Sequence, residues 1–64
     1  MFQISLRAAR VNAGYTQDAA SKKINVDKST IIKWEQGKTA PRADQLKSLC
    51  ELYNVPMDYI FLNK

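Results

Sequence analysis

Four residues divide the chain into short segments: Gly14, Asn25, Gly37 and Asn54. Gly and Asn are the residues that most readily adopt the left-handed backbone conformation at which α-helices end. Between these points the apolar residues recur at intervals of three and four, which is the period of a helix face. Strand signals are missing from the pattern. The sequence therefore predicts an all-α fold, a compact bundle of five short helices.

Helix starts are marked as well as helix ends. Thr16 can cap a second helix over about 17–23, and Asp27 can cap a third that runs to about Gln36. Pro56 fits the first turn of a fifth helix ending near Leu62. The expected inward residues are Phe2, Leu6, Ala9 and Ala13 in the first helix, Ala20 and Ile24 in the second, and Ala43, Leu46, Leu49, Cys50 and Tyr53 in the fourth.

Length and composition exclude several classes of function. A chain of 64 residues is one domain, and one this short buries only roughly 60% of the surface of its unfolded form. It has no histidine and a single cysteine, Cys50, which we expect to be a small core residue. Such a chain offers almost no zinc ligands, no histidine base and no glycine-rich phosphate loop. We expect no enzyme activity, no metal and no cofactor. No apolar run approaches the ~18 residues that span a membrane, and we expect a cytoplasmic protein.

The charge is unevenly distributed. Residues 1–42 hold eight basic and three acidic side chains, whereas residues 43–64 hold two basic and three acidic ones, so the net charge of +4 is +5 followed by −1. A basic front half suggests an anionic partner. On charge alone, a surface that lysines merely solubilise is an equal alternative.

The adjacent isoleucines in "NVDKSTIIKWEQG" cannot share the centre of one apolar stripe. Ile31 and Trp34 are three residues apart and therefore lie on one face, which we expect to face the core. Ile32 lies ~100° away around the helix axis. It groups with Lys28, Ser29 and Lys33, and Gln36 extends the same face. This outer face is rich in hydrogen-bond donors and carries one apolar side chain.

The ordered set "GYTQ…STIIKWEQGK…P" resembles the Cro/cI-type (XRE-type) helix-turn-helix family of phage repressors and bacterial regulators. The resemblance covers residues 6–61, with the helix-turn-helix motif at about 17–36, and implies a lambda-repressor-like DNA-binding domain. Its matching residues are Arg10, Gly14, Thr16, Gln17, Val26, Ile31, Trp34, Glu35, Gly37, Pro41 and the closing "DYIF". Three of the departures are Asn25 for the usual turn glycine, Ser21 for the usual alanine, and Pro56 for a usual serine cap, which leaves the start of the last helix open.

The resemblance implies a role for each matching position. In the family the second helix of the motif lies in the DNA major groove, so the expected base contacts are Lys28, Ser29, Ile32 and Lys33. The three polar side chains can hydrogen-bond base edges, and Ile32 can touch a thymine methyl. The expected backbone contacts are Gln17, Gln36, Lys38, Thr39 and Arg42. Arg10 and Glu35 are expected to form an ion pair that joins the first helix to the third; the alternative is an exposed pair of little energetic value.

The function predicted from this resemblance is a sequence-specific, double-stranded DNA-binding transcriptional regulator, a repressor that occupies a palindromic operator. We expect a homodimer on DNA, in a bacterial or phage-infected cell, with self-contact through Tyr59, Phe61 and Leu62. The alternative for these three residues is that they close the core. The alternative function is a protein-interaction module or antitoxin-like modulator, against which the lysine-rich outer face argues. Met1 favours a whole small protein over an excised domain.

Overall fold

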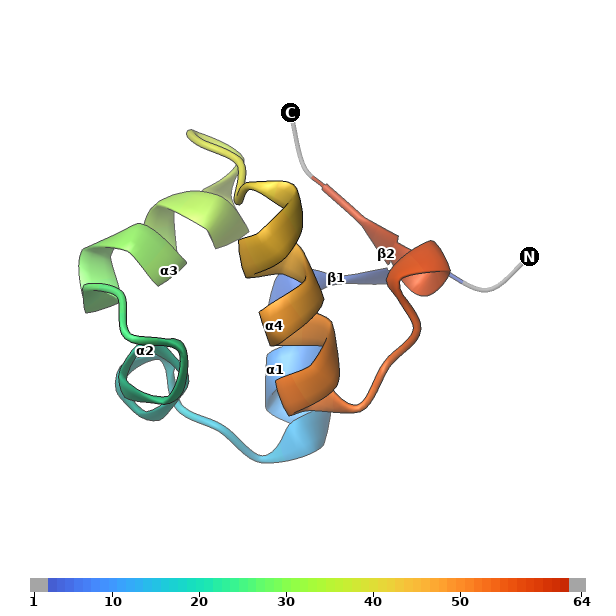
Figure 1. The fold of residues 1–64 in the computed structure, drawn as a ribbon, viewed down its shortest axis with the longest axis horizontal. Helices are drawn as coiled ribbons and strands as arrows, with labels where there is room; N and C mark the ends of the chain where they lie inside the picture. Colours follow the sequence, from blue (N-terminus) through green and yellow to red (C-terminus); the bar gives the residue numbers. More distant parts are fainter. Residues whose placement is uncertain (1–2, 63–64) are drawn as a thin grey trace.

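The computed structural model describes residues 3–62 of the chain (Figure 1). Four α-helices make up most of it: α1 (Leu6–Ala13), α2 (Gln17–Ile24), α3 (Lys28–Gln36) and α4 (Ala43–Tyr53). A single 3-10 turn, η1 (Met57–Tyr59), leads into a short strand, β2 (Ile60–Phe61), which pairs with β1 (Ile4–Ser5). In Figure 1, α1 and α4 overlap at the centre, α2 and α3 lie on one side, and the strand pair lies on the other.

The helix ends follow the predicted punctuation. Gly14, Asn25, Gly37 and Asn54 all have positive φ, between 57° and 86°, at the end of a helix. The Thr16 hydroxyl caps α2 by accepting a hydrogen bond from the Ala19 N–H at 3.0 Å. The predicted caps and stops are therefore confirmed, with one difference. Asp27 occupies the N-cap position of α3, but its side chain makes no capping hydrogen bond.

The core lies where the four helices meet. Its buried apolar residues come from every helix and from β1: Ile4, Leu6, Ala9, Ala20, Ile31, Trp34, Leu49, Cys50 and Tyr53. Cys50 is a buried free thiol, as expected, and burial raises its pKa above the ordinary value. None of the helices within residues 3–62 has the length and apolar content needed to cross a bilayer.

The prediction of a fifth helix in an all-α fold is wrong. After Pro56, only one 3-10 turn forms, closed by the Tyr59 N–H bonded to the Pro56 carbonyl at 3.0 Å. Ile60 then adopts extended dihedrals and pairs in parallel with Ile4, while Phe61 pairs with Ser5. β-branched and aromatic residues favour such extended segments, and pairing satisfies backbone groups that a longer helix would otherwise have bonded internally.

The first helix also starts later than its apolar spacing predicted. Ile4 and Ser5 are extended, and the Ser5 hydroxyl caps α1 by accepting from the Ala8 N–H at 3.1 Å. Phe2, expected on the inner face, lies outside the described residues. Ala13, also expected there, is exposed, as is Ala43 at the start of α4. Both lie at helix ends, where the next segment of chain turns away from the core.

Matched substitutions at the two adjacent isoleucines test how α3 is placed. Ile31 is 1% exposed, whereas Ile32 is half-buried. Removing one methylene from a filled core site leaves a small cavity, so Ile31→Val should lower the free energy of unfolding by about 1 kcal/mol. Ile32→Val should change it by less than about 0.5 kcal/mol. Urea denaturation gives both values, and equal losses at the two positions would contradict the assignment of faces.

Candidate nucleic-acid interface

The connection between α2 and α3 is short and internally bonded. Asn25 takes the left-handed conformation at φ 62°, and the next N–H, that of Val26, donates to the Ser21 carbonyl at 2.9 Å. Such a pair of features is the usual closed end of a helix. Ser21 is buried, and its hydroxyl donates to the Asp18 carbonyl at 2.7 Å. A small side chain that satisfies its own polar group lets the two helices cross closely.

α3 presents two different faces. Ile31 and Trp34 are buried in the core. The outer face is exposed at Lys28, Ser29, Lys33 and Gln36, with Ile32 half-buried among them. In Figure 1, α3 lies at the edge of the molecule, on the same side as α2 and away from the strand pair. The helix is thus held from one side while a basic, donor-rich surface remains accessible on the other.

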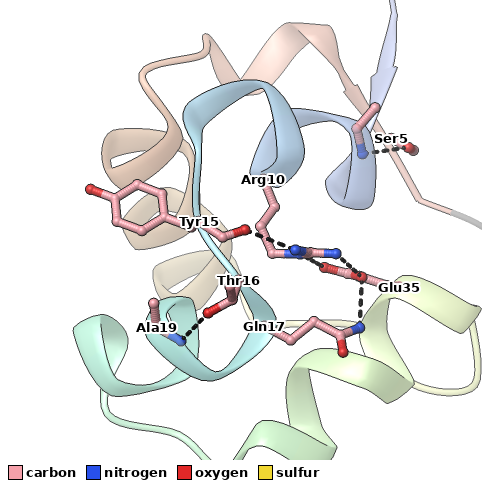
Figure 2. A network of polar contacts seen from close by, with 8 residues as sticks. Ser5, Arg10, Tyr15, Thr16, Gln17, Ala19 and Glu35 are labelled. Carbon is pink, nitrogen blue, oxygen red and sulfur yellow. Dashed lines mark hydrogen bonds and ion pairs between the residues drawn. The ribbon is translucent and has the colours of Figure 1, made fainter.

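The orientation of α3 is fixed at its other end by a buried ion pair. The Arg10 Nε of α1 donates to Glu35 Oε2 at 2.7 Å, and Arg10 Nη2 donates to Glu35 Oε1 at 3.3 Å (Figure 2). The two side chains are only 10% and 5% exposed. A third guanidinium donor, Nη1, bonds the Tyr15 carbonyl at 2.8 Å, in the loop between α1 and α2. The ion pair implied by the resemblance is present, and it is buried rather than exposed.

The carboxylate of Glu35 has a further donor. Gln17 Nε2, at the start of α2, donates to Glu35 Oε1 at 3.1 Å (Figure 2). Hydrogen bonds to an ionised, desolvated acceptor are stronger than neutral ones. The pKa of Tyr53 in α4 is raised to about 12. Burial contributes most to this rise and the Glu35 charge adds to it, while the Arg10 charge lowers the pKa. Glu35 therefore connects α3 to both α1 and α2.

The expected backbone-contact residues fall into two groups in the structure. Gln36, Lys38, Thr39 and Arg42 are exposed in and around the loop between α3 and α4. Arg42 also forms an exposed ion pair with Asp44, at 3.5 Å. Gln17 stands apart from them, because its amide is half-buried and bonded to Glu35.

Two contacts of the site were not predicted from the sequence. They are the Gln17–Glu35 hydrogen bond, between residues 18 apart, and the Arg10–Tyr15 carbonyl bond. Neither contact has a sequence signal. A glutamine after a helix cap is equally consistent with a solvated side chain, and a backbone carbonyl can accept a hydrogen bond at any residue type. Among residues 3–62, no three His, Cys, Asp or Glu side chains lie close enough together to hold a metal ion.

Two helices that cross at a closed turn define a helix-turn-helix domain when the second packs its inner face on the core and leaves its outer face exposed. Comparison with known families agrees with this geometry. The model of the helix-turn-helix family matches residues 6–60, and the chain belongs to that family. No solved structure matches the chain significantly.

Three curated proteins are similar to the chain. The HTH-type transcriptional regulator ImmR of Bacillus subtilis is 40% identical over 55 residues, 86% of this chain and 43% of that protein. The cryptic phage CTXphi transcriptional repressor RstR of Vibrio cholerae is 30% identical over 57 residues, 89% of this chain and 51% of that protein. The HTH-type transcriptional activator BcrR of Enterococcus faecalis is 30% identical over 57 residues, covering 89% and 28%. The chain thus spans about half, or less, of the length of these relatives.

Removing the arginine of the buried pair should destabilise the fold. Arg10→Met leaves the Glu35 charge buried without its cation, and the expected loss in free energy of unfolding is on the order of 3 kcal/mol. The double variant Arg10→Met, Glu35→Leu should recover part of that loss, because it buries no charge. Arg7→Met, at an exposed position of the same helix, is the matched control and should change stability by less than about 0.5 kcal/mol. A melting curve of Arg10→Met that overlays the wild type would contradict the structural role of the Arg10–Glu35 ion pair.

Proposed function

We propose that the chain is a DNA-binding domain that regulates transcription by occupying a specific site on double-stranded DNA. The observation that carries the proposal is the outer face of α3, where Lys28, Ser29 and Lys33 are exposed. The opposite side of the same helix is fixed by the buried Arg10–Glu35 ion pair. Family membership supports the proposal, as do the similar proteins ImmR, BcrR and RstR, which are transcriptional regulators. Repression is the simplest outcome, because a domain bound over an operator blocks access to it.

In this proposal α3 enters the major groove and reads base edges with Lys28, Ser29, Ile32 and Lys33. Lysine can donate to guanine O6 and N7, and serine can bond several base edges. The exposed side chains of Gln36, Lys38, Thr39 and Arg42 meet the sugar–phosphate backbone beside the groove. Such contacts set the register of the protein on the duplex without reading its sequence. Residues 6–61 form the proposed domain.

We propose that two copies bind together on a palindrome, with half-sites about one helical turn apart. A single short recognition helix reads few base pairs, so a second copy multiplies both affinity and specificity. Met57, Tyr59 and Phe61 support self-contact, since they are 42%, 40% and 41% exposed on the C-terminal side of the domain. Leu62 is half-buried and packs against the core. The core-closing alternative therefore suits Leu62 better than Tyr59 or Phe61.

The function is tested by selecting bound sites from a pool of random duplexes and then measuring affinity against salt. Counterion release predicts that log Kd rises linearly with log salt, with about 0.9 in slope for each phosphate neutralised. Lys28→Ala and Lys33→Ala should relax base preference at the selected site and weaken binding by about tenfold each. Lys47 is an exposed lysine of α4 outside the motif. Lys47→Ala is therefore the control, and it should keep the wild-type base preference and affinity. Binding that does not respond to salt would instead favour a protein partner.

The proposed role of Ile32 has a separate test. Replacing thymine by uracil in the selected site removes only the C5 methyl group. If Ile32 contacts that methyl, one such replacement should weaken wild-type binding about threefold to fivefold, as expected for about 0.8 kcal/mol per buried methyl-sized group. Ile32→Ala should bind the thymine and uracil duplexes equally. Equal binding of both duplexes by the wild type at every thymine would mean that Ile32 reads no methyl group.

A further inference from the structure

We propose that Gln17 is a positioning residue for α3, and that its side chain acts on base discrimination rather than as a direct contact to a DNA phosphate. The inference rests on the proposed function for its readout on DNA. It differs from the assignment of Gln17 as a backbone contact, which came from the family resemblance alone. What supports the new role is the partner that the amide has in the structure.

The contact itself is specific. Gln17 Nε2 donates to Glu35 Oε1 at 3.1 Å, and the same oxygen accepts from Arg10 Nη2 at 3.3 Å. The Glu35 side chain is 5% exposed, so water competes weakly for this carboxylate. An amide bonded to a desolvated carboxylate is held more firmly than one facing solvent. In Figure 2 the Gln17 side chain extends from the start of α2 toward Glu35 on α3, opposite Arg10.

The position of this bond in the motif gives it a mechanical role. α2 and α3 are joined at one end by the turn at Asn25, where the backbone is closed by the Val26 N–H and the Ser21 carbonyl. Gln17 lies at the first residue of α2 and Glu35 in the last turn of α3, so their hydrogen bond joins the two helices at the far end of the motif. With the turn at one end and this bond at the other, the angle between the helices is fixed. Arg10 by itself connects α3 to α1 and to the Tyr15 carbonyl in the loop before α2, but not to α2 itself.

The two roles predict different behaviour on DNA. A phosphate contact adds the same affinity on every sequence, because phosphates are the same everywhere. A contact that holds the reading helix in position adds affinity only where the bases match, because productive side-chain geometry tolerates displacements of only about 0.5 Å. Loss of a positioning contact therefore lowers the ratio of specific to nonspecific affinity. Loss of a phosphate contact leaves that ratio unchanged.

The experiment compares Gln17→Met with the wild type on two duplexes of equal length, the selected site and a scrambled sequence. Methionine keeps the length of the side chain and removes the amide donor. Working well below the melting temperature of both proteins, we expect Kd for the selected site to rise about tenfold, the size of one lost hydrogen bond to a charged group. Kd for the scrambled duplex should stay within about twofold. An equal rise on both duplexes would overturn the proposal.

Gln36→Met is the matched control, since Gln36 is an exposed glutamine at the end of α3 and a proposed phosphate contact. Gln36→Met should raise Kd for the selected and the scrambled duplex by the same factor. A second measurement needs no DNA: amide hydrogen exchange of the last turn of α3 should speed up in Gln17→Met relative to α4. Unchanged exchange in the last turn of α3 would overturn the positioning role, whatever the two Kd values are. Wild-type protein that fails to discriminate duplexes would instead count against the proposed function, while the exchange measurement still decides the role of Gln17.

Discussion

A carboxylate buried in a 64-residue domain needs its partners in place, because water is not there to replace them. Glu35 is that carboxylate, at 5% side-chain exposure. Its partners come from α1, through Arg10, and from α2, through Gln17. Arg10 in turn bonds the Tyr15 carbonyl in the intervening loop. One charge thus fixes three helices and a loop relative to each other, and the outer surface of α3 depends on that arrangement.

The small size of the core explains why such a contact is needed. Three of the nine buried apolar side chains within residues 3–62 are the small Ala9, Ala20 and Cys50, so apolar packing offers few large contacts to orient the short helices. Helices of eight to eleven residues are also too short to be stable in isolation. Closed helix ends at Gly14, Asn25, Gly37 and Asn54 stop them at defined points. The ion pair then supplies direction, which nonpolar contacts specify poorly, because a charged group tolerates fewer alternative partners than a methyl group does.

Local signals explain which parts of the fold were predictable. Helix ends were predicted because a positive φ restricts the residue type at one position, as at Asn25 and Asn54. The two faces of α3 followed from the separation of Ile31 and Ile32 around the helix. The fifth helix was wrong because the extended conformation of Ile60 depends on pairing with Ile4, 56 residues away. No local pattern encodes that contact. The partner of Gln17 was missed for the same reason: whether a glutamine faces solvent or a buried carboxylate depends on where α3 ends up.

Folding and the proposed recognition use different faces of α3, with one exception. Lys28, Ser29 and Lys33 are exposed, and substitutions at exposed helix positions usually change stability by less than about 0.5 kcal/mol. The proposed reading residues could therefore change with little effect on the fold, while Ile31, Trp34 and Glu35 hold the helix in place. Ile32 is the exception, because it is half-buried and lies between the two faces. A large change there would alter both the apolar contact proposed for DNA and the packing at the edge of the core, so recognition and stability are expected to be coupled more at Ile32 than at the exposed lysines.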